Sequence, residues 1–246
     1  MTSSYDVARR YRSRNVRYDL KRAFPVRQWC ANLDDMSMAG REPEADARRW
    51  AGSTLDERSA GRRRQLIEVG LELLGTEGAA AVTVRAVTRA AQLSPRYFYE
   101  SFSSREDLLE AAFDHGFGVI KSAVSEAMTA GGDFATQARA AIDATARCLE
   151  EDPRLGRALM REAIADPMLR RRAEGALVDF VLGVAVKSDE ALSQADPAKL
   201  QVGAIGIAGL QLAILMAWSE GQLPVSREAL VDQVVAVVVA IVSTLS

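Results

Sequence analysis

One stretch of the 246-residue chain, TVRAVTRAAQLSPRYFYESF from Thr83 to Phe102, most constrains the fold. Its first half places small or apolar side chains on one helical face: Val84, Val87, Thr88 and Ala91. After a short polar break, Ser94 can cap a second helix through its hydroxyl. Pro95 then takes the first helical position, where its missing N–H costs nothing. Phe98 and Phe102, four residues apart, fix this helix in the core. The pattern predicts a helix-turn-helix whose second helix enters a DNA major groove by its N-terminal residues.

The segment from about Arg62 to Leu109 resembles the N-terminal domain of the TetR/AcrR repressors. That family has an amphipathic first helix, T-x-x-x-I-A-x-x-A-G-V-S, a short variable segment, L-Y-x-H-F and K-E-x-L-L. The matching segments here are LIEVGLELLGTEG, TVRAVTRAAQLS, PRY, FYESF and SREDLL. This chain departs at three positions: Gln92 replaces the turn glycine, Ser101 a histidine and Arg105 a lysine. Because a left-handed backbone at Gln92 would cost of order 1–2 kcal/mol, we expect a slightly remodelled turn.

Arg96 and Tyr97 stand where the second helix would first meet the groove. Arginine can bond guanine O6 and N7 together, and a tyrosine can pack on a thymine methyl or bond a base edge. By the resemblance, further side chains match the family's phosphate contacts: Thr83, Arg85, Tyr99 and Arg105. Two other interpretations stay open, in which Tyr97 packs on Arg96 and Tyr99 is a half-buried core tyrosine. The complete set of expected DNA-binding residues is Thr83, Arg85, Ser94, Pro95, Arg96, Tyr97, Tyr99 and Arg105.

The charge composition indicates a local rather than a general basic surface. With 31 basic and 33 acidic residues the formal net charge is −2, so the chain is not a protein that covers nucleic acid through an overall basic surface. Arginines nevertheless gather around the motif: Arg62, Arg63, Arg64, Arg85, Arg89, Arg96 and Arg105. The two cysteines, Cys30 and Cys148, lie in different regions, so we expect no structural disulfide and a cytoplasmic location.

The sequence contains no catalytic constellation. His115 is the only histidine, so the sequence offers a single candidate residue for any histidine-based metal site or for a Ser-His or Cys-His catalytic relay. Neither G-x-G-x-x-G nor G-x-x-x-x-G-K-[ST] occurs. We therefore expect no enzymatic activity, no bound metal and no cofactor.

The periodicity predicts an all-α chain of about nine helices in three parts. Residues 54–110 form the helix-turn-helix domain, and the resemblance makes residues 111–246 an effector-binding and dimerisation domain. Capping boxes are expected at Thr54-x-x-Glu57 and Ser103-x-x-Glu106. Later helices should begin after capping residues, three of which precede a proline: Asp152, Asp166, Asp196 and Ser226. The long helix after the motif should bury one stripe: Leu109, Phe113, Gly116, Ile120 and Val124.

Residues 1–53 are basic and lack apolar periodicity. We expect a disordered extension, or a start codon placed too far upstream with Met36 or Met38 as the true start. The alternative is a basic arm that adds phosphate contacts or enters a minor groove.

The segments Val202–Trp218 and Val231–Val242 are apolar nearly all round. Both are shorter than the roughly 20 residues that a membrane span needs, so buried helices fit better than a membrane hairpin. They could complete a monomeric core. We favour a homodimer whose four-helix bundle uses these last two helices of each subunit, with Val238 in the interface.

Large apolar side chains could line an effector pocket, although each could equally be plain core: Phe134, Ile142, Met160, Phe180, Met216 and Trp218. The polar groups expected to point inward are Asp143, Thr145, Asp179 and Gln211. These features predict a ligand-responsive DNA-binding regulator, a repressor released from a palindromic operator by a small apolar or amphipathic effector. The alternative is a helical enzyme or protein-interaction module with an incidental helix-turn-helix.

Overall fold

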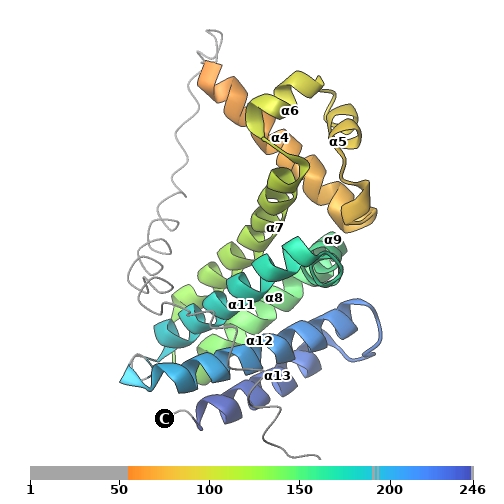
Figure 1. Cartoon of the computed structure of the whole chain (residues 1–246). Coiled ribbons are helices and arrows are strands. Elements are labelled where there is room, and N and C mark those ends of the chain that lie inside the picture. Colours follow the sequence, from red (N-terminus) through yellow and green to blue (C-terminus); the bar gives the residue numbers. More distant parts are fainter. Residues whose placement is uncertain (1–54, 190–191, 193, 245–246) are drawn as a thin grey trace, which may run out of the picture.

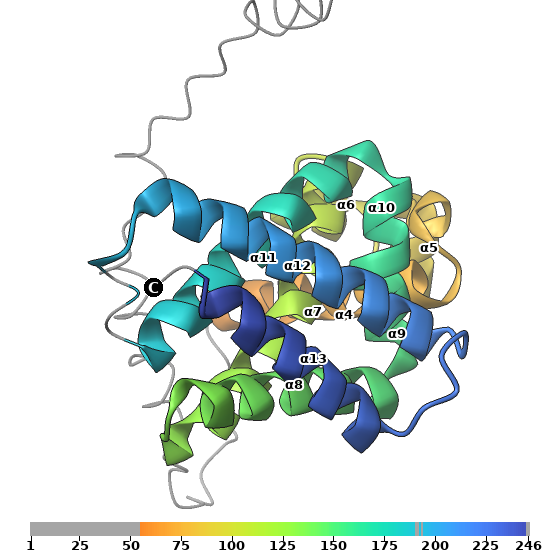
Figure 2. The same ribbon diagram turned by 90° about the horizontal axis from the view of Figure 1, so that it is seen from below.

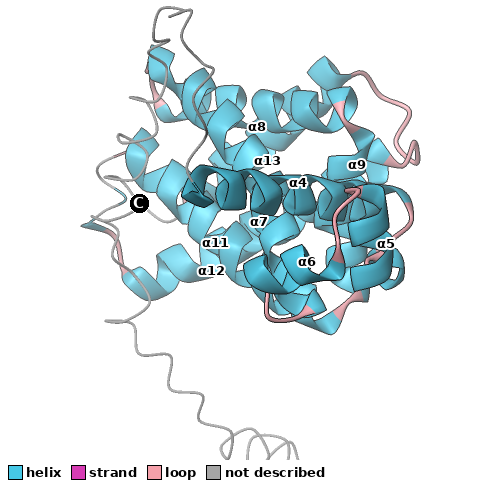
Figure 3. Cartoon of the chain, turned by 90° about the horizontal axis from the view of Figure 1, so that it is seen from above, coloured by secondary structure: helices cyan, strands magenta, loops and turns pink. Residues whose placement is uncertain are grey.

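The computed structural model describes residues 55–189, 192 and 194–244, and these residues form helices joined by loops, without a strand among them (Figures 1 and 3). Expectations for residues 1–53 and for a cap at Thr54 lie outside the described residues. The first part of the fold comprises α4 (Leu55–Thr76), η3 (Ala79–Ala81), α5 (Val84–Ala90), α6 (Pro95–Ser101), α7 (Arg105–Ala127) and η4 (Met128–Ala130). The second comprises α8 (Phe134–Glu151), α9 (Pro153–Gly156), η5 (Arg157–Glu162), α10 (Ala163–Ala165), α11 (Pro167–Ser188), α12 (Pro197–Ser219) and α13 (Arg227–Val242).

Helix α7 connects the two halves of the molecule. It packs on α4 near its start and continues into the larger bundle, where it packs on α8 and α11 (Figure 1). Its predicted apolar stripe is buried, from Leu109 to Val124. The expected boundary between residues 110 and 111 therefore falls inside one continuous helix, so a shift of α7 involves both halves.

The helix starts follow the predicted capping chemistry in most places. Asp152, Asp166 and Asp196 each accept a hydrogen bond from the backbone of the turn that follows, with proline at the first position. Ser226 caps α13 in the same way, by accepting from Ala229 N at 3.2 Å. Because these signals are local, the sequence alone determines them.

The predicted capping box at Ser103 is wrong by one residue. Ser104 is the N-cap of α7 and accepts from Asp107 N at 3.1 Å, while the Asp107 carboxylate accepts from Ser103 N at 3.1 Å. Glu106, the expected partner, pairs with Arg105 instead. Two adjacent serines followed by two adjacent acids allow both registers, and the sequence pattern does not choose between them.

The segment after Asp152 is not one regular α-helix. A short α9 passes into the π-helical η5 and then into α10. Counted as one interrupted helix, this segment brings the described residues to the nine helices that the sequence predicts. Such π-helical turns are rare and occur often at functional sites.

The last two helices are buried on one face only. Helix α13 packs on α8 through a stripe that includes Val234 and Val238, and α12 packs mainly on α11. Val238 is only 4% exposed within a single chain, so its predicted place in a dimer interface is wrong. Helix α12, with 23 residues, is long and apolar enough to cross a membrane, a test that core helices of soluble proteins also pass. Figure 2 shows α12 and α13 together on one face of the molecule.

Candidate DNA-binding interface and effector cavity

The turn between α5 and α6 keeps a left-handed residue where a slight remodelling was expected. Gln92 has a φ of 53°, a conformation that glycine adopts without steric strain. Backbone hydrogen bonds hold the turn: Leu93 N donates to Thr88 O at 2.9 Å, and Gln65 Nε2 of α4 donates to Ala91 O at 2.9 Å. The helix-turn-helix geometry is thus retained despite the missing glycine.

The starts of α5 and α6 differ in how they are capped. Thr83 accepts from Ala86 N at 3.1 Å through its hydroxyl. Ser94 stands at the N-cap of α6 and Pro95 at its first position, but the Ser94 hydroxyl makes no capping bond, contrary to the prediction. Its backbone carbonyl accepts from Tyr97 N at 3.0 Å instead. The Ser94 hydroxyl is therefore not committed to the helix.

Phe98 and Phe102 bury the inner face of α6, with ring centroids 5.7 Å apart. The opposite face is open: the Arg96 side chain is 84% exposed, and its Nε donates to Glu100 at 2.9 Å. Tyr99 is 62% exposed, which rules out its interpretation as a half-buried core residue. Because the core contacts fix the rotation of α6, Arg96 and Tyr99 must face outward.

Tyr97 packs on Arg62, and not on Arg96 as one interpretation of the sequence had it. The guanidinium of Arg62, on α4, lies 4.5 Å from the centroid of the Tyr97 ring. Arg63 lies similarly over Phe102, at 4.4 Å. These cation–π contacts place Arg62 beside the start of α6, where it adds positive potential next to Arg96, and Arg63 beside the C-cap of the same helix.

Arg105 is turned toward the protein. Its Nε donates to Val82 O at 2.6 Å, a second guanidinium nitrogen donates to Ala79 O, and the third pairs with Glu106 at 3.2 Å. The side chain therefore joins the start of α7 to η3 and the residue after it. The resemblance to the TetR/AcrR repressors predicts that Arg105 contacts a DNA phosphate. The carbonyl groups that it binds here are distant in sequence, so no sequence pattern indicates them.

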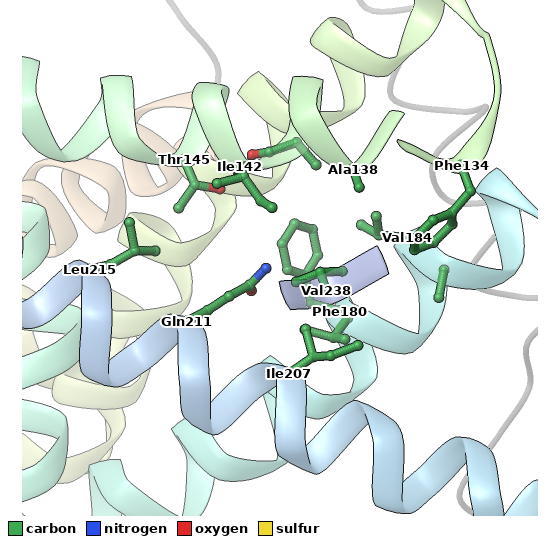
Figure 4. A pocket seen from close by; sticks show the side chains of 13 residues that line it. Phe134, Ala138, Ile142, Thr145, Phe180, Val184, Ile207, Gln211, Leu215 and Val238 are labelled. Atoms are coloured by element: carbon green, nitrogen blue, oxygen red, sulfur yellow. Dashed lines mark hydrogen bonds between the residues drawn. The ribbon is translucent and has the colours of Figure 1, made fainter. Parts of the chain in front are cut away.

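A cavity of about 40 Å³ lies between α8, α11 and α12, with one side chain from α13 (Figure 4). Three of the six side chains expected to line an effector pocket line it: Phe134, Ile142 and Phe180. The other three do not: Met160, Met216 and Trp218. Met160 lies in η5, and the Trp218 indole donates to Val225 O at 3.0 Å in the α12–α13 connection.

Small residues, which size alone did not suggest, complete the cavity wall. On α8 they fall between the expected side chains at helical spacing: Phe134, Ala138, Ala141, Ile142 and Thr145. The amphipathic pattern of this segment could have identified the face. On α11 and α12 the lining residues are apolar apart from Gln211.

Of the four polar groups expected to point inward, two line the cavity, Thr145 and Gln211. Asp143 instead accepts from Arg227 Nε at 3.0 Å and from Arg147. Asp179 is not part of the lining, and burial raises the pKa of its carboxyl. The cavity thus has an apolar wall with one amide and one hydroxyl.

The two halves of the molecule meet around Arg154 and Glu162. Arg154 pairs with Glu72 of α4 and with Asp152 at 2.7 Å, and its hydrogen bonds lower the pKa of Asp152. The Glu162 carboxylate accepts from Ala79 N at 3.0 Å. At Gly75, any side chain would place its Cβ 2.7 Å from the Arg154 carbonyl oxygen, so the α4–α9 contact requires glycine here.

A second, open groove of about 630 Å³ contains His115 and Cys148. Burial and the nearby Glu151 raise the pKa of the Cys148 thiol, so it stays protonated near neutral pH. Across the part of the chain that the structure describes, no group of three histidines, cysteines or acids is placed to hold a metal ion.

A family model described as "Bacterial regulatory proteins, tetR family" matches residues 66–112. Among solved structures, the fold is similar to a tetR-family transcriptional regulator from Streptomyces coelicolor, with 23% identity, a TM-score of 0.57, and 75% of this chain and 82% of that chain covered. It is also similar to the regulator FadR from Bacillus subtilis, solved in complex with stearoyl-CoA, with 16% identity, a TM-score of 0.59, and 71% and 96% covered. A TetR-like transcriptional regulator from Rhodococcus sp. RHA1 shares 16% identity, with a TM-score of 0.55 and 73% and 94% covered. Among curated proteins, nothing matches.

Proposed function

The chain belongs to the tetR family of bacterial regulatory proteins, and from this we propose that it is a cytoplasmic repressor released from a palindromic operator by a small effector. It is a DNA-binding transcriptional regulator, and its fold combines a helix-turn-helix domain with a helical C-terminal domain.

We assign base reading to the start of α6 and phosphate contacts to the residues around it. Arg96 is exposed enough to reach a guanine edge, and Tyr97 is held beside it by Arg62. Tyr99 and Arg85, both exposed, are assigned to phosphates, as is Thr83 at the N-terminus of α5. Ser94 and Pro95 complete the proposed interface at the tip of α6.

Arg105 is the weakest member of the proposed phosphate set. Its three nitrogens are already bonded within the protein, so a phosphate contact would need one of them to be shared. We propose that its main contribution to DNA binding is indirect, through the position of η3 and hence of α5.

We propose a homodimer through the open face of α12 and α13. Large apolar side chains are exposed on both helices, Val202 (71%) and Ile205 on α12 and Val237 on α13. The two helices lie together on one face of the molecule (Figure 2). Small α12 residues, Gly206 and Gly209, would allow helices of two subunits to approach closely, since an added Cβ at either position meets no atom within 4 Å of the single chain. A second subunit would remove this apolar surface from water.

We propose that the effector binds in the cavity between α8, α11 and α12 and favours a conformation in which α7 tilts. At about 40 Å³ the cavity has room for water, whereas ligand sites usually enclose about 300–1,000 Å³, so an effector must separate the helices around it. An effector must prefer the opened state by about 1–3 kcal/mol or more to change operator binding appreciably.

The observation that carries the proposal is the exposed Arg96–Tyr97–Tyr99 face on a helix whose rotation is fixed by Phe98 and Phe102. Selection of random duplex DNA with the full-length protein should return palindromes, with half-sites one helical turn or a multiple apart, roughly 34–36 Å per turn. Recovery of only asymmetric or single-stranded ligands would refute the dimeric reading mode.

Titration of Arg96→Ala on the selected site should show a loss of about 1–3 kcal/mol and a relaxed preference at one position of each half-site. Arg171→Ala is a matched control, because Arg171 is an exposed arginine on α11, outside the helix-turn-helix. Equal losses on all sequences for Arg96→Ala would mean that this side chain binds phosphate and reads no base.

A further inference from the structure

We infer that the cavity selects an uncharged amphipathic molecule: an apolar body with one hydroxyl or amide head group that hydrogen-bonds to Gln211 and Thr145. Carboxylates and other anions are rejected. This inference rests on the proposed function of the cavity as the effector site, and it names the chemical class of ligand.

Gln211 is the central observation. It lies on α12, an apolar helix, and its amide projects into the cavity (Figure 4). Within the described chain this side chain makes no hydrogen bond, and its amide remains accessible, since no fully buried side-chain nitrogen or oxygen of the described residues lacks a partner. A polar side chain in an apolar wall is stabilised by a hydrogen-bond partner, and water or a ligand in the cavity can supply that partner here.

Thr145 supplies the second polar group. It comes from α8, on the side of the cavity opposite α12 (Figure 4). Its hydroxyl donates to Ala141 O at 2.9 Å, so its oxygen is left as an acceptor. Gln211 can donate to a ligand oxygen through its N–H groups, and Thr145 can accept from a ligand O–H or N–H. The pair therefore fits a head group that both accepts and donates, such as a hydroxyl or a primary amide.

The rest of the lining excludes a charged head group. None of the thirteen lining residues carries a charge. The cations nearest to the lining along α8 and α13 are already engaged, because Arg139 pairs with Asp232, and Arg147 and Arg227 both pair with Asp143. Lys187 of α11 is exposed and is not part of the lining. An anion in the cavity would lose its hydration without gaining a cationic partner, which is far more costly than burying a neutral head group.

The body of the ligand is apolar and narrow. Side chains as small as Ala138, Ala141 and Ala185 line the cavity beside Phe134 and Phe180, and no other polar group faces them. The present volume is only about 40 Å³, so the helices must separate to admit a ligand. A flexible chain can enter with a smaller separation than a broad, rigid ring system, and is therefore favoured.

The test compares two probes that differ only in the head group, 1-octanol and octanoate, at about pH 8, where the carboxylate is ionised. Calorimetric titration of the full-length protein should show saturable binding of 1-octanol and at least about tenfold weaker binding of octanoate. Equal affinities for the two probes, or no binding of 1-octanol up to its solubility limit, would overturn the inference.

Variants of the amide then assign the selectivity. Gln211→Leu should weaken 1-octanol at least about tenfold, whereas Gln201→Leu, the same change on α12 away from the cavity lining, should not. Gln211→Lys should reverse the preference toward octanoate by supplying the missing cation. Unchanged octanol binding by Gln211→Leu, or a Gln211→Lys variant that folds and still rejects octanoate, would refute the role of Gln211.

Operator binding is measured separately in the same samples. If 1-octanol binds with the expected selectivity but leaves operator affinity unchanged, the cavity chemistry stands and the proposed release mechanism fails. If 1-octanol releases the operator without distinguishing Gln211→Leu from the wild-type protein, the release mechanism stands and the inference fails.

Discussion

Replacing Gln92 by glycine should stabilise the protein. Gln92 is exposed, makes no side-chain hydrogen bond within the described chain, and holds a φ of 53°. A left-handed conformation costs a non-glycine residue about 1–2 kcal/mol. Glycine removes this strain but loses more backbone entropy on folding, which costs about 0.5–1 kcal/mol. The net gain should be about 0.5–1 kcal/mol, or about 1–4 °C in melting temperature for a chain of this size.

Two control variants separate strain from other effects of the substitution. Gln92→Ala keeps a Cβ in the left-handed region, so it should leave the unfolding free energy nearly unchanged. Ala90→Gly introduces glycine at an exposed position of α5, where the backbone is helical, and should destabilise by up to about 1 kcal/mol. All variants are compared by urea denaturation with a common m-value, since a changed m-value would signal an altered unfolded state.

A Gln92→Gly variant that is no more stable than Gln92→Ala would contradict this prediction. That result would mean that the turn stores no strain at this residue. Operator affinity gives a second check: the substitution leaves the backbone bonds of the turn in place, including Leu93 N to Thr88 O, so affinity should not change. A large change in affinity would show that the turn had moved.

Three further outcomes follow from single contacts. Arg105→Ala should lower the unfolding free energy by about 1–3 kcal/mol, measured by denaturation, because two backbone carbonyls lose their charged donor. Val238→Asp should destabilise the single chain by several kcal/mol, whereas Val237→Asp should leave it folded but sediment as a monomer with weakened operator binding. Arg154 lowers the pKa of the Asp152 carboxyl, so the pair stabilises the fold fully at pH values above the ordinary carboxyl pKa. This stabilisation is lost as the pH falls through the lowered pKa of Asp152. The difference in unfolding free energy between wild type and Asp152→Asn should therefore shrink below about pH 4.

The helix-turn-helix could be predicted from the sequence because its signals are local. The Asp-Pro pairs, the spacing of Phe98 and Phe102, and the apolar stripe of α7 each depend on residues within a few turns of one another. Local capping and periodicity determine such elements before any tertiary contact forms. Two local predictions were wrong: the Ser94 hydroxyl does not cap α6, and at Ser103 two registers satisfy the same capping rule.

The roles of Arg105 and Val238 could not be predicted, because both depend on distant segments. The carbonyl partners of Arg105 lie 23 and 26 residues before it, and only the packing of α7 brings them together. On α13 nearly every side chain is apolar, so the sequence does not say which face meets α8. Val238 points into the protein and its neighbour Val237 outward, a distinction that periodicity cannot make when the pattern has no polar side.

Only half of the residues expected to line the cavity do so, because the lining also depends on how distant segments pack. Size identified Phe134 and Phe180, but a cavity also needs small residues opposite large ones, and alanines carry no signal of their own. Trp218, the largest apolar side chain proposed, is used instead in the connection to α13, where its indole donates to Val225 O. Large side chains fill space wherever the fold leaves it, so size alone does not distinguish a wall from a core.

The short η3 segment is held from both sides of the molecule. Arg105 of α7 donates to Ala79 O and Val82 O, and Glu162 of η5 accepts from Ala79 N. The residue after Val82 is Thr83, whose hydroxyl caps α5. A displacement of α7 or of η5 therefore moves η3 and with it the start of α5, while α6 follows through the turn. Because α7 also packs on α8, which forms one wall of the cavity, separation of the cavity helices has a direct mechanical route to the helix-turn-helix.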